Sequence, residues 1–139
     1  VQARKDPDGA NLDRIQVVKG WLDADGETQE QVFDVSWSDP DQRKPRADGK
    51  VPSVGSSVNE REATYTNTIG APTLTGYWKD PAFDPTQKAF YYVRVLEIPT
   101  PTWLAYDRKN YNLYDEMPAT APYTSQERAY TSPIWYTPS

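Results

Sequence analysis

Closely spaced aspartates are the residues of this chain whose type and spacing could support chemistry. Asp80 and Asp84 stand four residues apart, and paired carboxylates can act together as a general acid and a general base. Each of the two comes directly before a proline, however, and Asp-Pro commonly starts a turn. We therefore predict that both aspartates form turns and are not an acid–base pair.

A second aspartate pair resembles part of a calcium-binding EF-hand loop, since Asp23 and Asp25 are followed by Gly26. When Gly26 is aligned with the glycine that such a loop requires, Trp21 takes the first ligand position and Val32 the last. Neither side chain can bind a hard cation. The pattern therefore predicts the tight turn of a β-hairpin and no calcium site.

Histidine and cysteine are both absent from the 139 residues of the chain. The chain thus lacks the commonest general base, the commonest transition-metal ligands and every Ser-His or Cys-His nucleophile pair. We therefore assign no catalytic residue, no metal ligand and no cofactor to this chain. By itself it is expected to be catalytically silent and to bind no transition metal.

The composition favours one all-β domain that spans residues 1–139. Proline (13), tyrosine (10) and tryptophan (5) are abundant, and no long stretch has the periodicity of a helix. The net charge of −5 argues against a nucleic-acid partner, because binding phosphates needs a cationic surface. No apolar run is long enough to span a bilayer. The short basic group Arg43, Lys44 and Arg46 is predicted to lie in a solvated loop.

The longest run of β-branched and aromatic residues, Lys88–Ile98, predicts the central strand of the sheet. The best hairpin joins residues 13–23 to residues 31–38. In its second strand Phe33, Val35 and Trp37 alternate with polar neighbours and are predicted to share one buried face, together with Tyr91, Val93 and Val95 of the central strand. Gly20 is expected to mark a bulge or the close approach of another backbone.

Four further segments are predicted as strands, and two as long loops. The strands are residues 1–5, 63–69, 73–79 and 130–137, and the loops are residues 39–62 and 99–128. Pro133 confines the last strand to an edge or a bulge. Six or seven antiparallel strands separated by turns predict an immunoglobulin-like β-sandwich with long loops.

The loop 99–128 carries the candidate functional residues, Trp103, Tyr106, Tyr111 and Tyr114. Large rings with a polar tip are typical anchors of protein interfaces or linings of a cleft. We expect one or two helical turns over residues 103–109. Two interpretations remain open: the segment meets another part of a longer protein, or it folds back over its own sheet.

Four blocks of the chain resemble the bacterial "domain of unknown function" family numbered 3604. They are Asn11–Trp21, Thr64–Pro72, Phe90–Pro99 and Glu127–Pro138, in consistent order along nearly the whole chain. One residue departs from the family pattern: Thr102 stands where arginine is expected, so no anion contact is carried over to this position.

The resemblance implies a place among proteins similar to the polymerase-and-histidinol-phosphatase (PHP) superfamily of metal-dependent phosphoesterases. Their metal ligands are histidine-rich motifs towards the N-terminus, and none can be carried over here. The chain then corresponds to a C-terminal, non-catalytic accessory domain of a hydrolase that binds divalent metal ions. Its partner would be the N-terminal catalytic portion of the same protein, in a secreted or periplasmic setting. A stand-alone binding or structural module with exposed Trp and Tyr is the alternative, because such rings stack on sugars.

Overall fold

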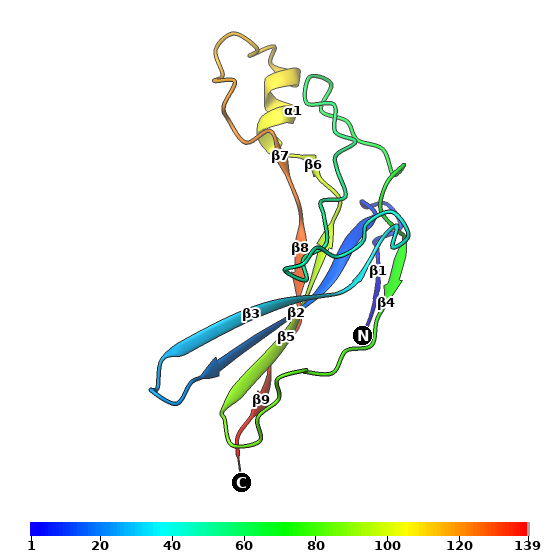
Figure 1. Ribbon diagram of the computed structural model, residues 1–139. Coiled ribbons are helices and arrows are strands. Elements are labelled where there is room, and N and C mark those ends of the chain that lie inside the picture. Colours follow the sequence, from blue (N-terminus) through cyan, green and yellow to red (C-terminus); the bar gives the residue numbers. More distant parts are fainter. Residues whose placement is uncertain (139) are drawn as a thin grey trace.

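The structure, a computed structural model, describes residues 1–138 and is mostly β. Its main sheet is antiparallel and five-stranded, with the order β3-β2-β5-β8 and with β9 also paired to β5 (Figure 1). The strands of this sheet are β2 (Leu12–Leu22), β3 (Thr28–Trp37), β5 (Ala89–Glu97), β8 (Arg128–Tyr130) and β9 (Ile134–Tyr136).

Two short antiparallel pairs and one helix complete the described part of the chain. The pairs are β1 (Gln2–Arg4) with β4 (Thr73–Thr75) and β6 (Thr100–Pro101) with β7 (Thr124–Ser125), and the helix is α1 (Trp103–Asn110). The prediction of an all-β chain with antiparallel sheets is therefore confirmed at the level of class. The structure does not show an immunoglobulin-like sandwich: the strands belong to one five-stranded sheet and two small pairs.

The hairpin predicted around Asp23 is confirmed, with β2 and β3 as its strands. One carboxylate oxygen of Asp23 accepts the backbone N–H groups of Asp25 and Glu27, at 3.0 and 2.9 Å, and the other accepts the amide of Gln29 at 2.8 Å. These hydrogen bonds, chiefly that from Gln29, lower the pKa of Asp23. The carboxylate thus serves as the acceptor that closes a turn.

The predicted central strand is also confirmed, because β5 pairs with β2 along one edge and with β8 and β9 along the other. The most buried strand is nevertheless β2, in which residues 12–20 are all buried. Its Leu12 and Ile15 form the core of the sheet with Leu74, and half-buried Val93 and Val95 pack against them. Gly20 lies beneath the ring of Phe90, which leaves no room for a larger residue.

A β-bulge at Val35 corrects the predicted face of β3. Ile15 lies opposite Ser36 while Gln16 lies opposite Asp34, so that Val35 has no partner on β2. The extra residue reverses the alternation. Trp37 therefore lies opposite Arg14, on the other side of the sheet from Phe33, and the prediction that both share one buried face was wrong.

Three other predicted strands are absent, shorter or divided in the structure. Residues 63–69 form turns and only one isolated bridge, between Asn59 and Thr64. The backbone N–H and carbonyl of Thr66 bond to the hydroxyl of Ser57 and not to a neighbouring strand. Of residues 73–79 only β4 is a strand. The last predicted strand is divided into β8 and β9 on either side of Pro133, at the edge of the sheet, which agrees with the position expected for proline.

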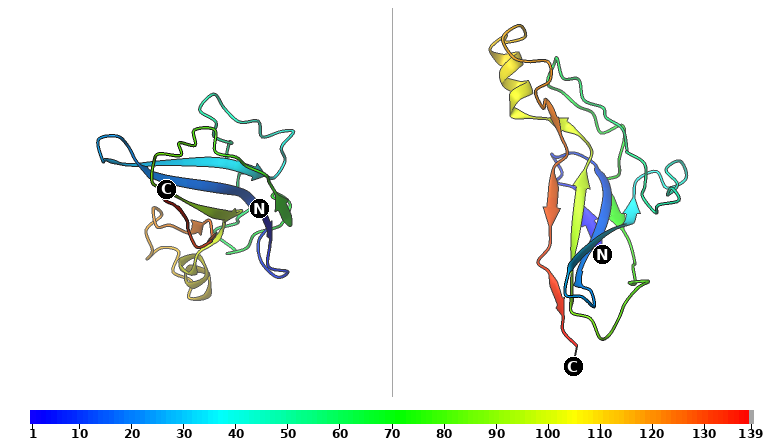
Figure 2. Two further views of the ribbon diagram at one scale, coloured as in Figure 1. Left: turned by 90° about the horizontal axis from the view of Figure 1, so that it is seen from below. Right: turned by 60° about the vertical axis from the view of Figure 1, so that its left-hand side comes forward.

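We call residues 59–64 together with residues 99–125 the cap. Figures 1 and 2 show the helix of the cap at one end of the elongated molecule, beyond the main sheet. The cap has a small hydrophobic cluster of its own, with Ala63, Ala105 and Tyr123 buried at its centre. The helix expected over residues 103–109 is confirmed as α1.

Candidate functional site

Two hydrogen bonds connect the segment before helix α1 to the segment that leaves the cap. The N–H of Thr102 donates to the carbonyl of Tyr123 at 2.9 Å, and its hydroxyl donates to the carbonyl of Pro122 at 2.8 Å. Helix α1 starts at the next residue, and buried Ala105 faces the cluster under Tyr123. The side of α1 opposite Ala105 therefore faces solvent.

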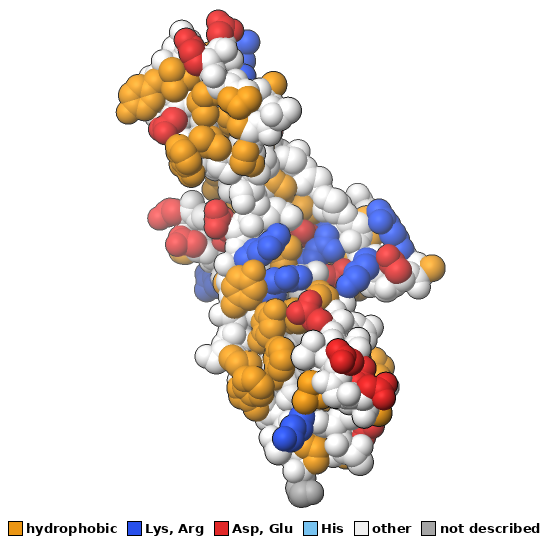
Figure 3. Space-filling model, turned by 90° about the vertical axis from the view of Figure 1, so that its left-hand side faces the viewer, with side chains coloured by type: hydrophobic (Ala, Val, Ile, Leu, Met, Phe, Trp, Pro, Cys, Tyr) orange, Lys and Arg blue, Asp and Glu red, His pale blue; other side chains and the backbone are white. Residues whose placement is uncertain are grey.

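Three of the four candidate rings lie on the exposed surface of the cap. Trp103 and Tyr106 are three residues apart on α1 and therefore neighbours on one side of the helix, and they are 70% and 43% exposed. Tyr111, just after the helix, is 72% exposed. Figure 3 shows hydrophobic side chains gathered on this end of the molecule.

The fourth ring, Tyr114, is half-buried within the cap. Its hydroxyl donates to the carbonyl of Arg61 at 2.9 Å. The guanidinium of Arg61 lies 5.4 Å from the centre of its ring and that of Arg108 lies 5.1 Å from it, distances typical of cation–π contacts. The structure thus brings Trp103 and Tyr106 together on one helix face and places Tyr114 in a separate arginine cluster.

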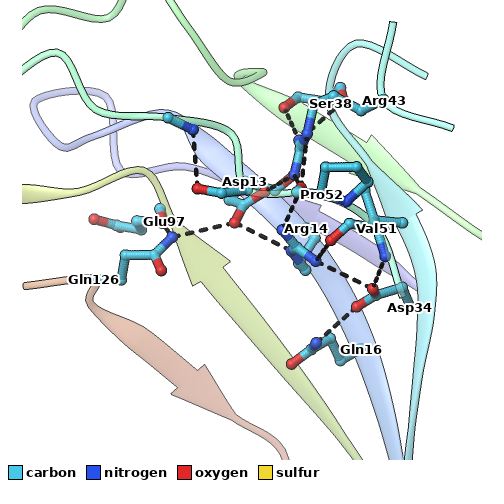
Figure 4. Close-up of polar contacts among 12 residues, drawn as sticks. Asp13, Arg14, Gln16, Asp34, Ser38, Arg43, Val51, Pro52, Glu97 and Gln126 are labelled. Carbon is cyan, nitrogen blue, oxygen red and sulfur yellow. Dashed lines mark hydrogen bonds and ion pairs between the residues drawn. The ribbon is translucent and has the colours of Figure 1, made fainter. Parts of the chain in front are cut away.

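A buried ionic network, which we name the Arg43 network, was missed by the sequence analysis (Figure 4). It contains two arginines and two aspartates, Arg14, Arg43, Asp13 and Asp34, so that its formal charges balance. Arg43 is buried and donates to the carboxylate of Asp13, to the carbonyl and hydroxyl of Ser38 and to the carbonyl of Pro52.

The prediction of a solvated basic loop was therefore wrong for Arg43. Arg14 joins the same network, donating to Asp34 at 3.1 Å and to the carbonyl of Val51 at 2.8 Å. Gln126 donates to Asp13 at 3.1 Å. The network fastens the segment from Ser38 to Pro52, and the chain leaving the cap, onto the first residues of β2. Because its members bond to one another and to loop carbonyls, we assign the network the role of positioning these loops.

A second buried cluster lies on the opposite face of the sheet. The ammonium group of Lys19 lies 2.6 Å from a carboxylate oxygen of Asp80, and the hydroxyl of Tyr91 donates to the same oxygen at 2.7 Å. Burial by itself would raise the pKa of Asp80, but the hydrogen bonds from Lys19 and Tyr91 outweigh it and the pKa is lowered. Burial, and then the bond to Asp80, raises the pKa of Tyr91.

The turn predictions for Asp80 and Asp84 are confirmed. One oxygen of Asp80 accepts the N–H of Ala82 at 2.9 Å, and Asp84 accepts that of Thr86 at 2.8 Å. The pairing of Asp80 with Lys19 had no signal in the sequence, since the two residues are far apart along the chain. Lys19 also donates to the carbonyl of Ala82 at 2.9 Å, so this cluster pins the connection before β5 against the sheet.

A groove of about 520 Å³ opens at the hairpin end of the sheet. Its lining includes Gly20, Leu22, Phe90 and Trp135, and the rings of Phe90 and Trp135 are 5.2 Å apart. Trp135 is 72% exposed. Figure 3 shows hydrophobic side chains over this part of the surface as well. Trp135 was not among the candidate residues predicted from the sequence, although its type is the same as that of Trp103.

Within residues 1–138, no three carboxylates lie close enough together to hold a metal ion. The one helix in that range is too short and too polar to cross a membrane. The described surface offers two kinds of groups for binding: exposed rings on the cap and on the sheet, and the arginine cluster at Tyr114.

Comparison with known proteins places the chain in a family. No curated protein and no solved structure matches the chain. A family model described as "Protein of unknown function (DUF3604)" matches residues 1–138, and the chain therefore belongs to this family.

Proposed function

We propose that the chain is the C-terminal, non-catalytic accessory portion of a PHP-like metal-dependent hydrolase of the phosphoesterase type. The divalent metal ions and their histidine ligands belong to the N-terminal catalytic portion of the parent protein, and the cap docks against that portion. The observation that carries this proposal is the exposure of Trp103 and Tyr106 side by side on α1.

The cap and the main sheet have separate hydrophobic cores. The cap buries its own cluster under Tyr123, and the sheet buries a different cluster around Ile15. Trp103 and Tyr106 therefore belong neither to the core of the cap nor to the core of the sheet. Each ring can bury about 150–250 Å² against a partner and still expose or bond its polar tip. Aromatic residues of this kind are enriched at the centres of interfaces.

Replacing Trp103 and Tyr106 together with Ser tests the proposal in two proteins. In the isolated chain the free energy of unfolding is expected to stay within about 0.5 kcal/mol, since both rings are exposed. In the parent protein the same change is expected to weaken docking and to lower hydrolase activity about tenfold or more, because buried interface rings commonly contribute 2 kcal/mol or more. Urea unfolding and steady-state turnover are the measurements.

Tyr77→Ser is the matched control, because Tyr77 is 88% exposed and lies outside the cap. It should alter neither the stability of the chain nor the activity of the parent protein. If the cap variant unfolds the isolated chain, the rings are internal packing. If it leaves the parent protein unchanged, the cap is not the docking surface.

A stand-alone binding module is the second candidate, and the groove beside Trp135 is the observation that favours it. Its volume is within the range of small-molecule sites, and an exposed indole can stack on a sugar ring. Oligosaccharide titration followed by tryptophan fluorescence, with Trp135→Ala as the variant, tests this function. Saturable binding that Trp135→Ala removes would favour it over the docking role.

A further inference from the structure

Two arginines and two tyrosines of the cap form an alternating stack. The guanidinium of Arg61 lies over one side of the Tyr114 ring, and Arg108 contacts both Tyr114 and Tyr123, at 4.6 Å from the centre of the Tyr123 ring. Stacking satisfies the flat faces of a guanidinium while leaving its in-plane N–H groups to donate hydrogen bonds. The stack thus orients the guanidinium groups of Arg61 and Arg108 and leaves their N–H groups able to donate to a ligand.

Acceptors for these donors are missing within residues 1–138. No ion pair within 4 Å joins Arg61 or Arg108 to a carboxylate in that range, and the Nε of Arg108 is buried without a hydrogen-bond partner. Buried polar groups of proteins are nearly always bonded, and an exception calls for an explanation such as a bound ion or ligand. Both arginines of the Arg43 network, in contrast, donate to acceptors from each of their three side-chain nitrogens.

The stack borders a hollow of about 610 Å³, large enough for a small ligand. Its lining consists of Arg61, Arg108, Tyr114, Asn112, Glu60 and Asp115. The carboxylate of Glu60 accepts a hydrogen bond from Thr124 at 2.9 Å but forms no ion pair with either arginine. The hollow therefore offers guanidinium donors together with two acidic acceptors.

We propose that this hollow is a binding site for a small polar ligand that carries one carboxylate, sulfate or phosphate group. The anionic group meets the in-plane N–H groups of Arg61 and Arg108, whose forked geometry matches two oxygens at once. Hydroxyl or amino groups of the same ligand face Glu60 and Asp115. The site uses side chains other than Trp103 and Tyr106, so it is independent of the docking proposal.

The test is an NMR titration of the full 139-residue chain with sodium phosphate, sodium sulfate and sodium acetate, each against sodium chloride at equal ionic strength. The Nε–H of Arg108 belongs to the proposed fork of donors, and its signal reports on an anion bound by this guanidinium group. A saturable shift of this signal with at least one of the three oxyanions, and none with chloride, is expected. The anion that binds most tightly identifies the group.

Arg61→Lys and Arg108→Lys keep the charge but remove the fork, and each is expected to weaken binding about tenfold. Arg46→Lys is the control, since Arg46 is exposed and does not line the hollow. Because Arg61 is itself exposed, its variant tests the site even if Arg108→Lys disturbs the cap. A shift that grows linearly with every salt, or binding that Arg61→Lys leaves unchanged, would overturn the proposal.

Discussion

Replacing Arg43 with Met is expected to destabilise the chain by about 3–5 kcal/mol, the usual result of removing one partner from a buried ionic network. The Arg43 network contains two positive and two negative residues. Without Arg43 it retains one excess negative charge near the start of β2, where Asp13 is 2% exposed. The carbonyl groups of Ser38 and Pro52 also lose a donor.

Urea unfolding followed by tryptophan fluorescence measures this change. Arg46→Met is the matched control: Arg46 belongs to the same loop but is exposed, so its replacement should change the free energy of unfolding by less than about 0.5 kcal/mol. Equal stabilities of the two variants would contradict the assignment of Arg43 to the buried network. Adding Asp13→Asn to Arg43→Met should recover part of the loss, because it removes the excess charge.

The sequence predicted well those parts of the fold that local pattern determines. The β2–β3 hairpin follows from a turn between two alternating segments, and β5 from an unbroken run of β-branched and aromatic residues. The helix α1 was expected from residues 103–109. The bulge at Val35 was not predictable, since an inserted residue is defined only by its partner strand.

Burial of charged residues was the main feature that the sequence concealed. Arg43 stands next to Lys44 in a polar, proline-containing segment, which is typical of a solvated loop. Its burial depends on the packing of residues 38–52 against the start of β2, and this is a contact between distant parts of the chain. The same reason applies to Lys19, whose partner Asp80 precedes the next strand of the sheet.

The types of the residues in the candidate site could be predicted from the sequence, but the role of each residue could not. Trp103, Tyr106 and Tyr111 are exposed, as an interface requires, and whether they form one remains a proposal. Tyr114 belongs instead to the arginine stack, because Arg61 reaches it from a separate segment of the cap. No spacing along the chain pairs these two residues, so only the folded structure reveals the hollow beside them.

Asp80→Ala is expected to have an effect of similar size to Arg43→Met, about 3–5 kcal/mol. The side chains of Lys19 and Asp80 are only 5% and 6% exposed, so the substitution leaves an ammonium group buried without a counter-ion. The rings of Trp21 and Tyr91 lie 5.0 and 5.9 Å from this ammonium group and compensate only in part. Tyr91→Phe removes a single hydrogen bond to Asp80 and should cost about 0.5–1.5 kcal/mol.

The pH dependence of stability separates the charge of Asp80 from its packing. The pKa of Asp80 in the folded chain is below its ordinary value of 3.8, so its contribution is complete above pH 3.8 and is lost as the pH falls through the lower, folded-state pKa. Asp23 and Asp84 also have lowered pKa values, and both remain in Asp80→Ala. The difference in unfolding free energy between the unmodified chain and Asp80→Ala should therefore be constant at neutral pH and shrink below pH 3.8. A difference that stays constant to the lowest pH at which the chain folds would show that Asp80 stabilises the sheet through its shape and not through its charge.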